Sequence, residues 1–205
     1  MRLAVFASGG GSNFGAIIDA VAAGVLPAEL VLLVADRAGT GAAARAEAAG
    51  VPVAVVAPGD YPAAGAFGDA LLAELDARQA DFAALAGYLR MIPPAVVARF
   101  RNRMLNVHPA LLPAFGGHGL YGRRVHEAVL AAGVKVSGAT VHLVDEHYDT
   151  GPIVLQQCVP VLDDDTPETL AARVLAVEHR ALPEALRLFA EGKARVEGKA
   201  VRVEN

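Results

Sequence analysis

The sequence predicts an α/β fold in which a doubly wound, mostly parallel sheet is followed by a C-terminal helix and hairpin. Short apolar runs alternate with helical patterns up to residue 107, which is typical of a Rossmann-like half with parallel strands joined by helices. These runs are apolar on both faces, as strands covered on both sides are. Hydrophobic residues make up 54% of the 205 residues, enough for a substantial core in one domain.

The elements of the first half follow from the spacing of apolar residues. Strands are expected at residues 3–7, 30–35, 53–56, 82–85 and 104–107. Helices are expected after Ser12 and Asn13, and at residues 42–49, 66–79 and 94–100. In the first of these helices one face carries Phe14, Ile17, Ile18 and Val21.

The second half has a different character. Residues 111–122 form a Gly- and Pro-rich loop with little periodicity, and its length indicates a function. A helix is expected at residues 125–132. Two strands are expected at residues 137–144 and 153–161, with parallel and antiparallel pairing both left open. We call the segment that joins them, residues 145–151, the acidic connection.

The last segment contains a long helix and a hairpin. Thr166 and Pro167 open the helix as a cap and a first-turn proline. Pro183 is expected to kink the helix or to mark a joint, and a hairpin is expected at residues 195–202. The inward face of the helix is expected to carry Leu170, Val174, Val177, Ala181 and Phe189.

The segment at residues 9–13, which we call the glycine loop, follows the first strand and opens the first helix. Its glycines let the backbone approach an anion, and a helix N-terminus offers unpaired N–H groups beside Ser12 and Asn13. It is neither a Walker A loop, which needs a lysine, nor a dinucleotide fingerprint, because Phe14 stands at the third glycine position. The loop predicts a site for a single phosphate, with a tight turn and helix cap as the alternative.

Asn106 and His108 lie two residues apart at the expected carboxyl end of a strand, so their side chains point the same way. Open α/β sheets bind ligands at this edge, and Pro109 stops the strand there. Residues 150–152 fix the position of Asp149, whose charge beside His108 is expected to raise the pKa of the imidazole and orient the ring. An amide, an imidazole and a carboxylate at one centre suit the movement of a carbonyl group between amines.

The remaining polar residues favour structural roles. Asp145 and Glu146 are typical of a solvated acidic loop. Of the other five histidines, four are expected to be structural or on the surface, and His142, on the strand leading to Asp149, is a candidate support for the site. Cys158 is expected to be a packed core thiol, and as the single cysteine it excludes disulfide scaffolds and multi-cysteine metal sites. No metal is expected, because the candidate ligands lack the usual zinc spacing.

Charge and hydrophobicity exclude further classes. The net charge of −4 argues against a nucleic-acid partner, because proteins that bind the phosphate backbone carry a basic surface. No apolar run reaches the roughly 18 residues of a membrane span. The apolar run at residues 3–7 is too brief for a signal peptide, so a cytoplasmic location is expected.

The chain resembles the folate-dependent glycinamide ribonucleotide formyltransferases of purine biosynthesis over nearly its whole length. The resemblance is carried by the segments ASGGGSN at 7–13, LAGYLRM at 85–91, LNVHPALLP at 105–113 and VHLVDEHYDTGP at 141–152. It implies the formyltransferase fold in a single domain, residues 1–205, with a nucleotide-binding half at 1–107 and an active-site and folate-binding half at 108–205.

The resemblance also implies roles for individual residues. The implied catalytic residues are Asn106, His108 and Asp149. The implied substrate-binding residues are Gly11, Ser12, Asn13, Pro109 and Glu178. The implied folate-binding residues are Arg90, Met91, Ile92, Asn106, Asp145 and Asp149. The loop at residues 116–122 follows one branch of the family rather than the most familiar bacterial one, which leaves its substrate contacts open.

The implied reaction transfers the formyl group of 10-formyltetrahydrofolate, a co-substrate, to the amine of glycinamide ribonucleotide. The residue types suit direct attack through a tetrahedral intermediate, with Asn106 and protonated His108 stabilising the oxyanion and Asp149 relaying the proton. The expected partners are these small molecules, without nucleic acid or membrane, and the expected state is a monomer or homodimer.

Three alternatives remain open. A formyltetrahydrofolate hydrolase uses the same trio but gives the formyl group to water, and we expect it to carry an additional N-terminal regulatory domain. A methionyl-tRNA formyltransferase carries a C-terminal nucleic-acid-binding domain, for which we expect this chain to have no room. In a non-catalytic nucleotide-binding module, the glycine loop would bind a dinucleotide and Asp36 the ribose, which leaves Asn106 and His108 unexplained.

Overall fold

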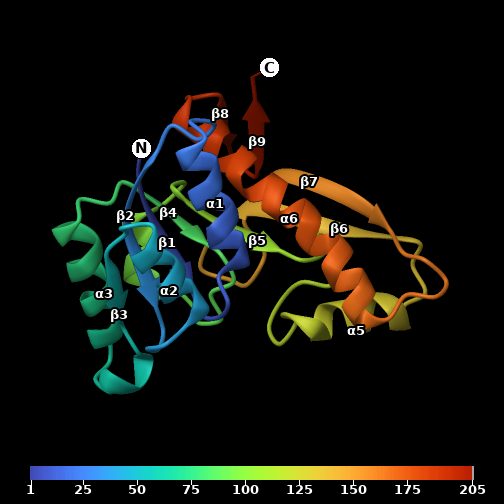
Figure 1. Ribbon diagram of the computed structural model, residues 1–205, viewed down its shortest axis with the longest axis horizontal. Helices are drawn as coiled ribbons and strands as arrows, with labels where there is room; N and C mark the ends of the chain where they lie inside the picture. The colour runs from blue at the N-terminus through green and yellow to red at the C-terminus, as the bar shows by residue number, and fades with distance from the viewer. Residues whose placement is uncertain (205) are drawn as a thin grey trace. The chain divides into compact units, whose positions relative to one another are not determined.

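The computed structural model describes residues 1–204 (Figure 1). The chain divides into two compact units, Met1–Asn106 and Val107–Asn205. The expected functional division of a single domain at residue 107 stays a prediction.

Five strands form the sheet of the first unit. They are β1 Arg2–Ala7, β2 Glu29–Ala35, β3 Val53–Val55, β4 Phe82–Leu85 and β5 Met104–His108, whose last two residues belong to the second unit. All pair in parallel, in the order β3-β2-β1-β4-β5. β1 is central, and its apolar residues from Leu3 to Ala7 are fully buried, as strands covered on both faces are.

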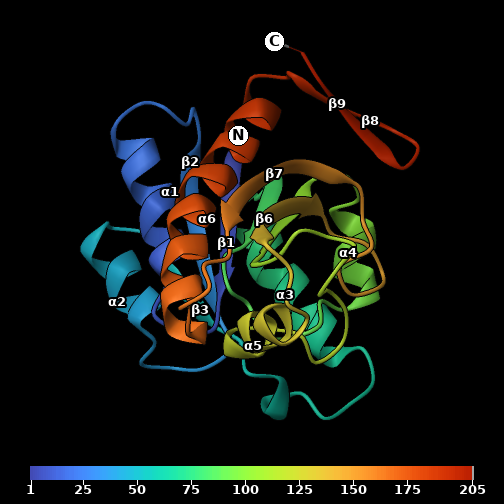
Figure 2. The ribbon, with the colours of Figure 1, turned by 90° about the vertical axis from the view of Figure 1, so that its right-hand side faces the viewer.

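The helices of the first unit cover both faces of this sheet. They are α1 Ser12–Ala22, α2 Gly41–Ala48, α3 Ala66–Ala77 and α4 Pro94–Arg99, with a 3-10 turn at Pro58–Asp60. Helix α1 contacts α2, and α3 contacts α4. In Figure 2 the first pair lies on one side of β1, β2 and β3, and the second pair on the other. Phe14 and Ile17 of α1 are fully buried because they lie on its inward face.

The second unit contains two helices and four strands besides the end of β5. They are α5 Arg123–Ala131, β6 Val136–Leu143, β7 Ile153–Pro160, α6 Pro167–Ala190, β8 Ala194–Glu197 and β9 Ala200–Val203. Strands β6 and β7 pair antiparallel, and β8 and β9 form a separate hairpin. Helix α6 contacts β6, β7 and α5 and lies across both strands (Figure 1). The predicted fold class, an α/β fold with a doubly wound, mostly parallel sheet and a C-terminal helix and hairpin, is confirmed.

Helix α6 differs from the expectation at one point. Thr166 and Thr169 form a reciprocal capping box at its start, as the sequence indicates. The helix then continues through Pro183 as one element of 24 residues, without a joint. Pro183 is buried together with Leu182, Ala185 and Leu186, and packing of this face offsets the backbone hydrogen bond that a proline cannot donate.

Cys158 is exposed, so the prediction of a packed core thiol is wrong. Successive side chains of a strand point to opposite faces. Cys158 shares the face of Gln156 on β7, which is also exposed, whereas Val159 beside it is buried. An apolar strand pattern therefore did not distinguish the covered face from the open one.

No helix within residues 1–204 combines the length and apolar character that a membrane span requires.

Candidate active site

The glycine loop in the first unit is shaped by close packing against α2. Gly11 is the N-cap of α1 and has a left-handed φ of 71°. A Cβ at Gly11 would lie 2.6 Å from Cα of Ala42, and the N–H of Ala42 donates to Gly9 O at 3.1 Å. Only glycine tolerates both this conformation and this approach. The predicted residues Ser12 and Asn13 then open α1, where the first N–H groups of a helix are available to an anion.

Arg45 lies beside this loop, although sequence reasoning did not single it out. Its Nε donates to Gly10 O at 3.0 Å, and its guanidinium approaches Gly15 of α1. Arg45 lies on α2, far from the glycine loop in sequence. Its position on the helix that follows α1 was the only signal in the sequence for this contact. Arg45 adds a positive charge next to the glycine loop.

Arg90, Met91 and Ile92 follow β4 in the first unit. The Nε of Arg90 lies 2.8 Å from Oδ2 of Asp36, whose side chain is fully buried. Met91 is exposed, whereas Ile92 is buried. Oδ1 of Asp36 has no hydrogen-bond partner within residues 1–204, but it is fully buried, so a ribose hydroxyl cannot reach it and the dinucleotide alternative is weakened.

Asn106 and His108 occupy alternate positions near the end of β5, as predicted. Asn106 is half-buried and His108 is buried. Pro109 follows the last residue of the strand and is half-buried. Alternate residues of a strand point to the same face, so the amide and imidazole belong to one face of β5.

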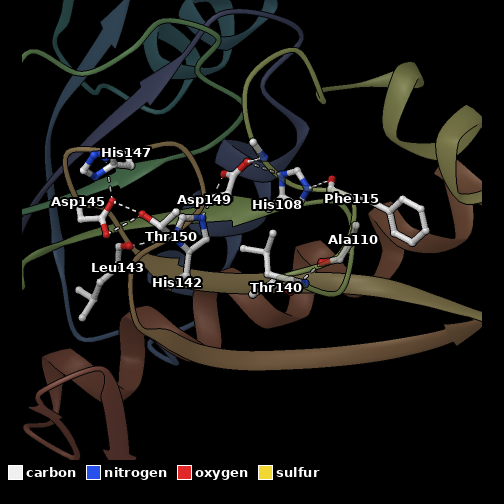
Figure 3. A network of polar contacts seen from close by, with 12 residues as sticks. His108, Ala110, Phe115, Thr140, His142, Leu143, Asp145, His147, Asp149 and Thr150 are labelled. Atoms are coloured by element: carbon white, nitrogen blue, oxygen red, sulfur yellow. Dashed lines mark hydrogen bonds and ion pairs between the residues drawn. The ribbon is translucent and has the colours of Figure 1, made fainter.

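In the second unit, His108 and His142 flank the carboxylate of Asp149, and we call these three residues the histidine–aspartate network (Figure 3). Nδ1 of His108 lies 3.6 Å from Oδ2 of Asp149, and Nε2 of His142 lies 3.5 Å from Oδ1. Each ring also hydrogen-bonds a backbone carbonyl, His108 through Nε2 to Phe115 O at 2.8 Å and His142 through Nδ1 to Leu143 O at 2.9 Å. The structure thus brings His108 and Asp149 together, with His142 in support.

Asp149 is held by the backbone as well. Its Oδ2 accepts a hydrogen bond from the N–H of Gly117 at 2.9 Å. Asp149 has a left-handed φ of 57°, a conformation that Asp tolerates better than most residues with a Cβ. The carboxylate is therefore fixed by three partners from three segments of the chain.

The ionisation of this network follows from its burial. Burial lowers the pKa of His108, and the charge of Asp149 and the hydrogen bond to Phe115 only partly oppose this effect. The charge of Asp149 raises the pKa of His108 as expected, but desolvation outweighs this charge, so the pKa of His108 lies below its ordinary value. Burial would raise the pKa of Asp149, but the hydrogen bonds from His142 and Gly117 and the charge of His108 together lower it. Burial thus favours the neutral form of His108, and the groups around Asp149 favour its carboxylate form.

The acidic connection is braced by Asp145. Oδ1 of Asp145 accepts hydrogen bonds from the N–H of His147 at 3.0 Å and from Oγ1 of Thr150 at 2.8 Å (Figure 3). Gly151 lies so close to Leu143 O that an added Cβ would be 1.8 Å away. These contacts hold the turn that presents Asp149.

Glu178, the predicted substrate-binding residue of α6, is buried.

Thr140 is a supporting residue that sequence reasoning missed. Its hydroxyl donates to Ala110 O at 2.7 Å and accepts from the N–H of Leu112 at 3.0 Å. Nε2 of Gln156 donates to both Leu112 O and the Thr140 hydroxyl. These bonds fasten the chain directly after His108 onto β6. Its position two residues before His142, on the same face of a strand, was the available signal.

His126 was expected among the structural or surface histidines, and it is buried on α5. Within residues 1–204 its Nδ1 has no hydrogen-bond partner. Burial lowers its pKa, and the charge of His108 lowers it further. His126 therefore belongs to the electrostatic surroundings of His108.

No group of three or more His, Cys, Asp or Glu side chains in the described part of the chain is arranged to hold a metal ion. The donors of both units instead suit organic and phosphate groups: backbone N–H groups in the glycine loop, and an imidazole with a carboxylate in the network.

Comparison with known proteins agrees with this chemistry. Residues 1–186 match the family described as formyl transferase. The chain is 45% identical to the chloroplastic phosphoribosylglycinamide formyltransferase of Vigna unguiculata over 93% of this chain, but it spans only 61% of that relative. It is 45% identical to the phosphoribosylglycinamide formyltransferase of Mycobacterium tuberculosis over 97% of this chain and 89% of the relative.

A solved structure of glycinamide ribonucleotide transformylase 1 from Symbiobacterium toebii is similar to this chain with a TM-score of 0.94 and 44% identity. It covers all of this chain, which in turn covers 94% of the other. Family match, sequence identity and fold agree over almost the whole sequence. The chain therefore belongs to the formyl transferase family.

Proposed function

We propose that the protein is a phosphoribosylglycinamide formyltransferase, which moves the formyl group of 10-formyltetrahydrofolate to the amine of glycinamide ribonucleotide in purine biosynthesis. The observation that carries the proposal is the approach of His108 to Asp149, 3.6 Å apart in a buried network. Neither residue is a nucleophile positioned for a covalent adduct. The pair suits proton transfer at a reacting carbonyl.

The glycine loop supports the nucleotide side of this proposal. Gly11, Ser12 and Asn13 bind the phosphate through N–H groups at the start of α1, where the helix dipole favours an anion. We assign Glu178 to the ribose or its neighbourhood and Pro109 to substrate binding, as the family resemblance implies. Relatives that are named for this activity match nearly the whole chain.

The folate side rests on Arg90, Met91 and Ile92 and on the acidic connection with Asp145 and Asp149. Arg90 is partly exposed although its Nε pairs with Asp36, so the rest of its guanidinium remains available. Asp145 orders the turn before Asp149 and so contributes to folate binding through the shape of that turn.

The reaction proceeds by direct transfer. The substrate amine attacks the formyl carbon, the carbonyl oxygen takes the negative charge, and the bond from carbon to N10 of the folate then breaks. Asn106 stabilises the oxyanion by hydrogen bonding, and the charged imidazole of His108 stabilises it electrostatically, since Nε2 bonds Phe115 O and Nδ1 faces Asp149. The oxyanion adds a second negative charge beside His108, and this favours the charged imidazole that burial alone disfavours. Asp149 helps to pass the proton from the amine towards N10. The amine thus exchanges a proton for the formyl group and N10 the reverse, and nothing is oxidised or reduced.

The test is to incubate the protein with 10-formyltetrahydrofolate, with and without glycinamide ribonucleotide, and to measure formyl loss and formylated product. The proposal expects formyl loss only with the nucleotide and in equal amount with product. Formyl loss that ignores the nucleotide would identify a hydrolase. Absence of loss under both conditions would identify a binding module.

The variant Asn106→Ala tests the oxyanion role directly. Loss of one such donor typically lowers turnover by about 10²–10³. Asn106→Asp keeps the size of the side chain but replaces the amide donor by an acceptor, so it is expected to fall at least as far. Near wild-type turnover in a folded Asn106→Ala protein would refute the role. The cytoplasmic location and the monomeric or homodimeric state remain predictions.

A further inference from the structure

A single tripeptide in the loop at residues 111–122 contacts both His108 and Asp149. Phe115 O bonds His108 Nε2 at 2.8 Å, and the N–H of Gly117 donates to Asp149 Oδ2 at 2.9 Å. We propose that the backbone of residues 115–117 is the positioning segment of the active site, which selects the tautomer of His108 and holds the Asp149 carboxylate facing it. The proposal rests on the proposed function for its catalytic meaning.

The contact with Phe115 determines which nitrogen of His108 carries the proton. A carbonyl oxygen can only accept, so the neutral ring must carry its hydrogen on Nε2. Nδ1 is then left without hydrogen, and it faces Asp149 Oδ2 at 3.6 Å. The proton that His108 gains and loses during the reaction is therefore the one at Nδ1, on the side of Asp149.

The contact with Gly117 acts on the same carboxylate oxygen that faces His108. A hydrogen bond to an ionised carboxylate stabilises the charged form. The other oxygen, Oδ1, faces His142 at 3.5 Å. The groups that face Asp149 are thus the N–H of Gly117, which favours its ionised form, and the imidazoles of His108 and His142, which favour it when they are protonated.

The conformation of the tripeptide explains why two glycines occur here. Phe115 and Gly117 have left-handed φ values of 57° and 98°, which aim a carbonyl and an N–H from neighbouring peptides at the pair. A Cβ at Gly116 would lie 2.4 Å from Cδ2 of Leu112 and 3.2 Å from Cβ of Asp149. A side chain at Gly116 would therefore push the segment away from Asp149. Residues held in such sparsely populated conformations are often found at functional sites.

Both ends of the segment are held in place. On one side, Thr140 binds the backbone of Ala110 and Leu112 and so fixes the approach to Phe115. On the other, the ring of His118 packs edge-on against Tyr148, with centroids 5.7 Å apart. Tyr148 directly precedes Asp149, so this contact joins the segment to the acidic connection a second time.

The decisive variant removes the N–H of Gly117 without adding a side chain, by replacing Gly117 with glycolic acid so that the peptide bond becomes an ester. The matched control is the same replacement at Gly119, which lies in the same loop with a left-handed φ of 87° and has nothing within 4 Å of an added Cβ. Turnover is expected to fall about ten-fold or more for the Gly117 ester, the loss typical of a hydrogen bond to a charged group. The Gly119 ester is expected to remain near wild type.

The pH profile provides a readout that a merely structural role would not change. Because the Gly117 N–H favours the ionised form of Asp149, its loss raises the pKa of that carboxyl. The acidic limb of turnover against pH is therefore expected to move to higher pH in the Gly117 ester and to stay in place in the Gly119 ester. Equal profiles, or equal loss in both esters, would overturn the proposal.

A spectroscopic measurement separates this proposal from the proposed function. In ¹⁵N spectra of His108 above the pH range of its titration, the wild type is expected to show hydrogen on Nε2. Gly116→Ala is expected to yield a tautomer mixture. Gly119→Ala strains the backbone at a φ of 87° but has open space around its Cβ, and it is expected to keep the Nε2 form. A wild-type ring with hydrogen on Nδ1 would overturn the proposal even if formyl transfer is observed. The Nε2 form in a protein without transfer would contradict the proposed function alone.

Discussion

The glycine loop is made of backbone groups from one short stretch of the first unit, whereas the histidine–aspartate network is made of side chains from separate segments of the second unit. The loop is shaped by sterics, with Gly11 against Ala42. The network is shaped by burial and hydrogen bonding, which favour the neutral form of His108 and the ionised form of Asp149. The function of the glycine loop therefore depends on the shape of its backbone, and that of the histidine–aspartate network on the protonation of its side chains. Substitutions should therefore affect binding in one region and turnover or pH response in the other.

The largest effect is expected in the network, for Asp149→Asn. Asn keeps the size of the side chain and also tolerates the left-handed φ of this position, but it loses the charge that faces two imidazoles. Turnover should fall by at least about 10²–10³, while the melting temperature changes little. Steady-state kinetics and thermal unfolding measure the two quantities, and a folded variant with normal turnover would remove Asp149 from the mechanism.

The next effect is expected in the glycine loop, for Gly11→Ala. The new Cβ would collide with the backbone of α2, so the loop must open and lose hydrogen bonds to the phosphate. We expect KM for glycinamide ribonucleotide to rise about 10–100-fold, as for lost hydrogen bonds to a charged group, with a smaller change in kcat.

Gly24→Ala is the matched control for this variant. Gly24 has nearly the same φ, 69°, but open space around its Cβ, so it reports conformational strain without the collision. Should both variants raise KM equally, backbone strain rather than the shape of the glycine loop would be responsible.

A smaller effect is expected on the pH dependence of the free energy of unfolding, and it comes from buried histidines of the second unit. Burial lowers the pKa values of His108 and His126 in the folded protein. Below the ordinary histidine pKa of about 6.5 the unfolded chain takes up protons that the folded chain does not. Stability is therefore retained above that pH and falls as the pH decreases toward the folded pKa, by at most about 1.4 kcal/mol per pH unit for each histidine.

His126→Gln should flatten this dependence, whereas His147→Gln, at an exposed position, should not. Urea unfolding between pH 7.5 and 5 measures the slope. A slope that survives His126→Gln unchanged would show that the burial of His126 does not contribute to it.

The smallest effect is expected for Cys158→Ser, which belongs to neither region. Because Cys158 is exposed, its replacement should change the free energy of unfolding by less than about 0.5 kcal/mol. Chemical denaturation measures this value. A loss of several kcal/mol would restore the idea of a packed core thiol.

Much of the fold could be predicted because it depends on short-range patterns. Apolar runs located every strand of the first unit to within one or two residues, and a cap with a following proline located the start of α6. Other features could not be predicted. The exposure of Cys158 depends on which face of β7 is covered, and the continuity of α6 at Pro183 depends on its buried neighbours.

The sequence by itself determined the α/β fold class, the family resemblance, the glycine loop and the alternate placement of Asn106 and His108, because each depends on residues close together in the chain. The folded structure was needed to establish that His108 meets Asp149, that residues 115–117 bind both, and that burial lowers the pKa of His108 by more than Asp149 raises it. Desolvation and hydrogen bonding depend on which segments surround a group. They are properties of the folded chain, and no local pattern of residues records them.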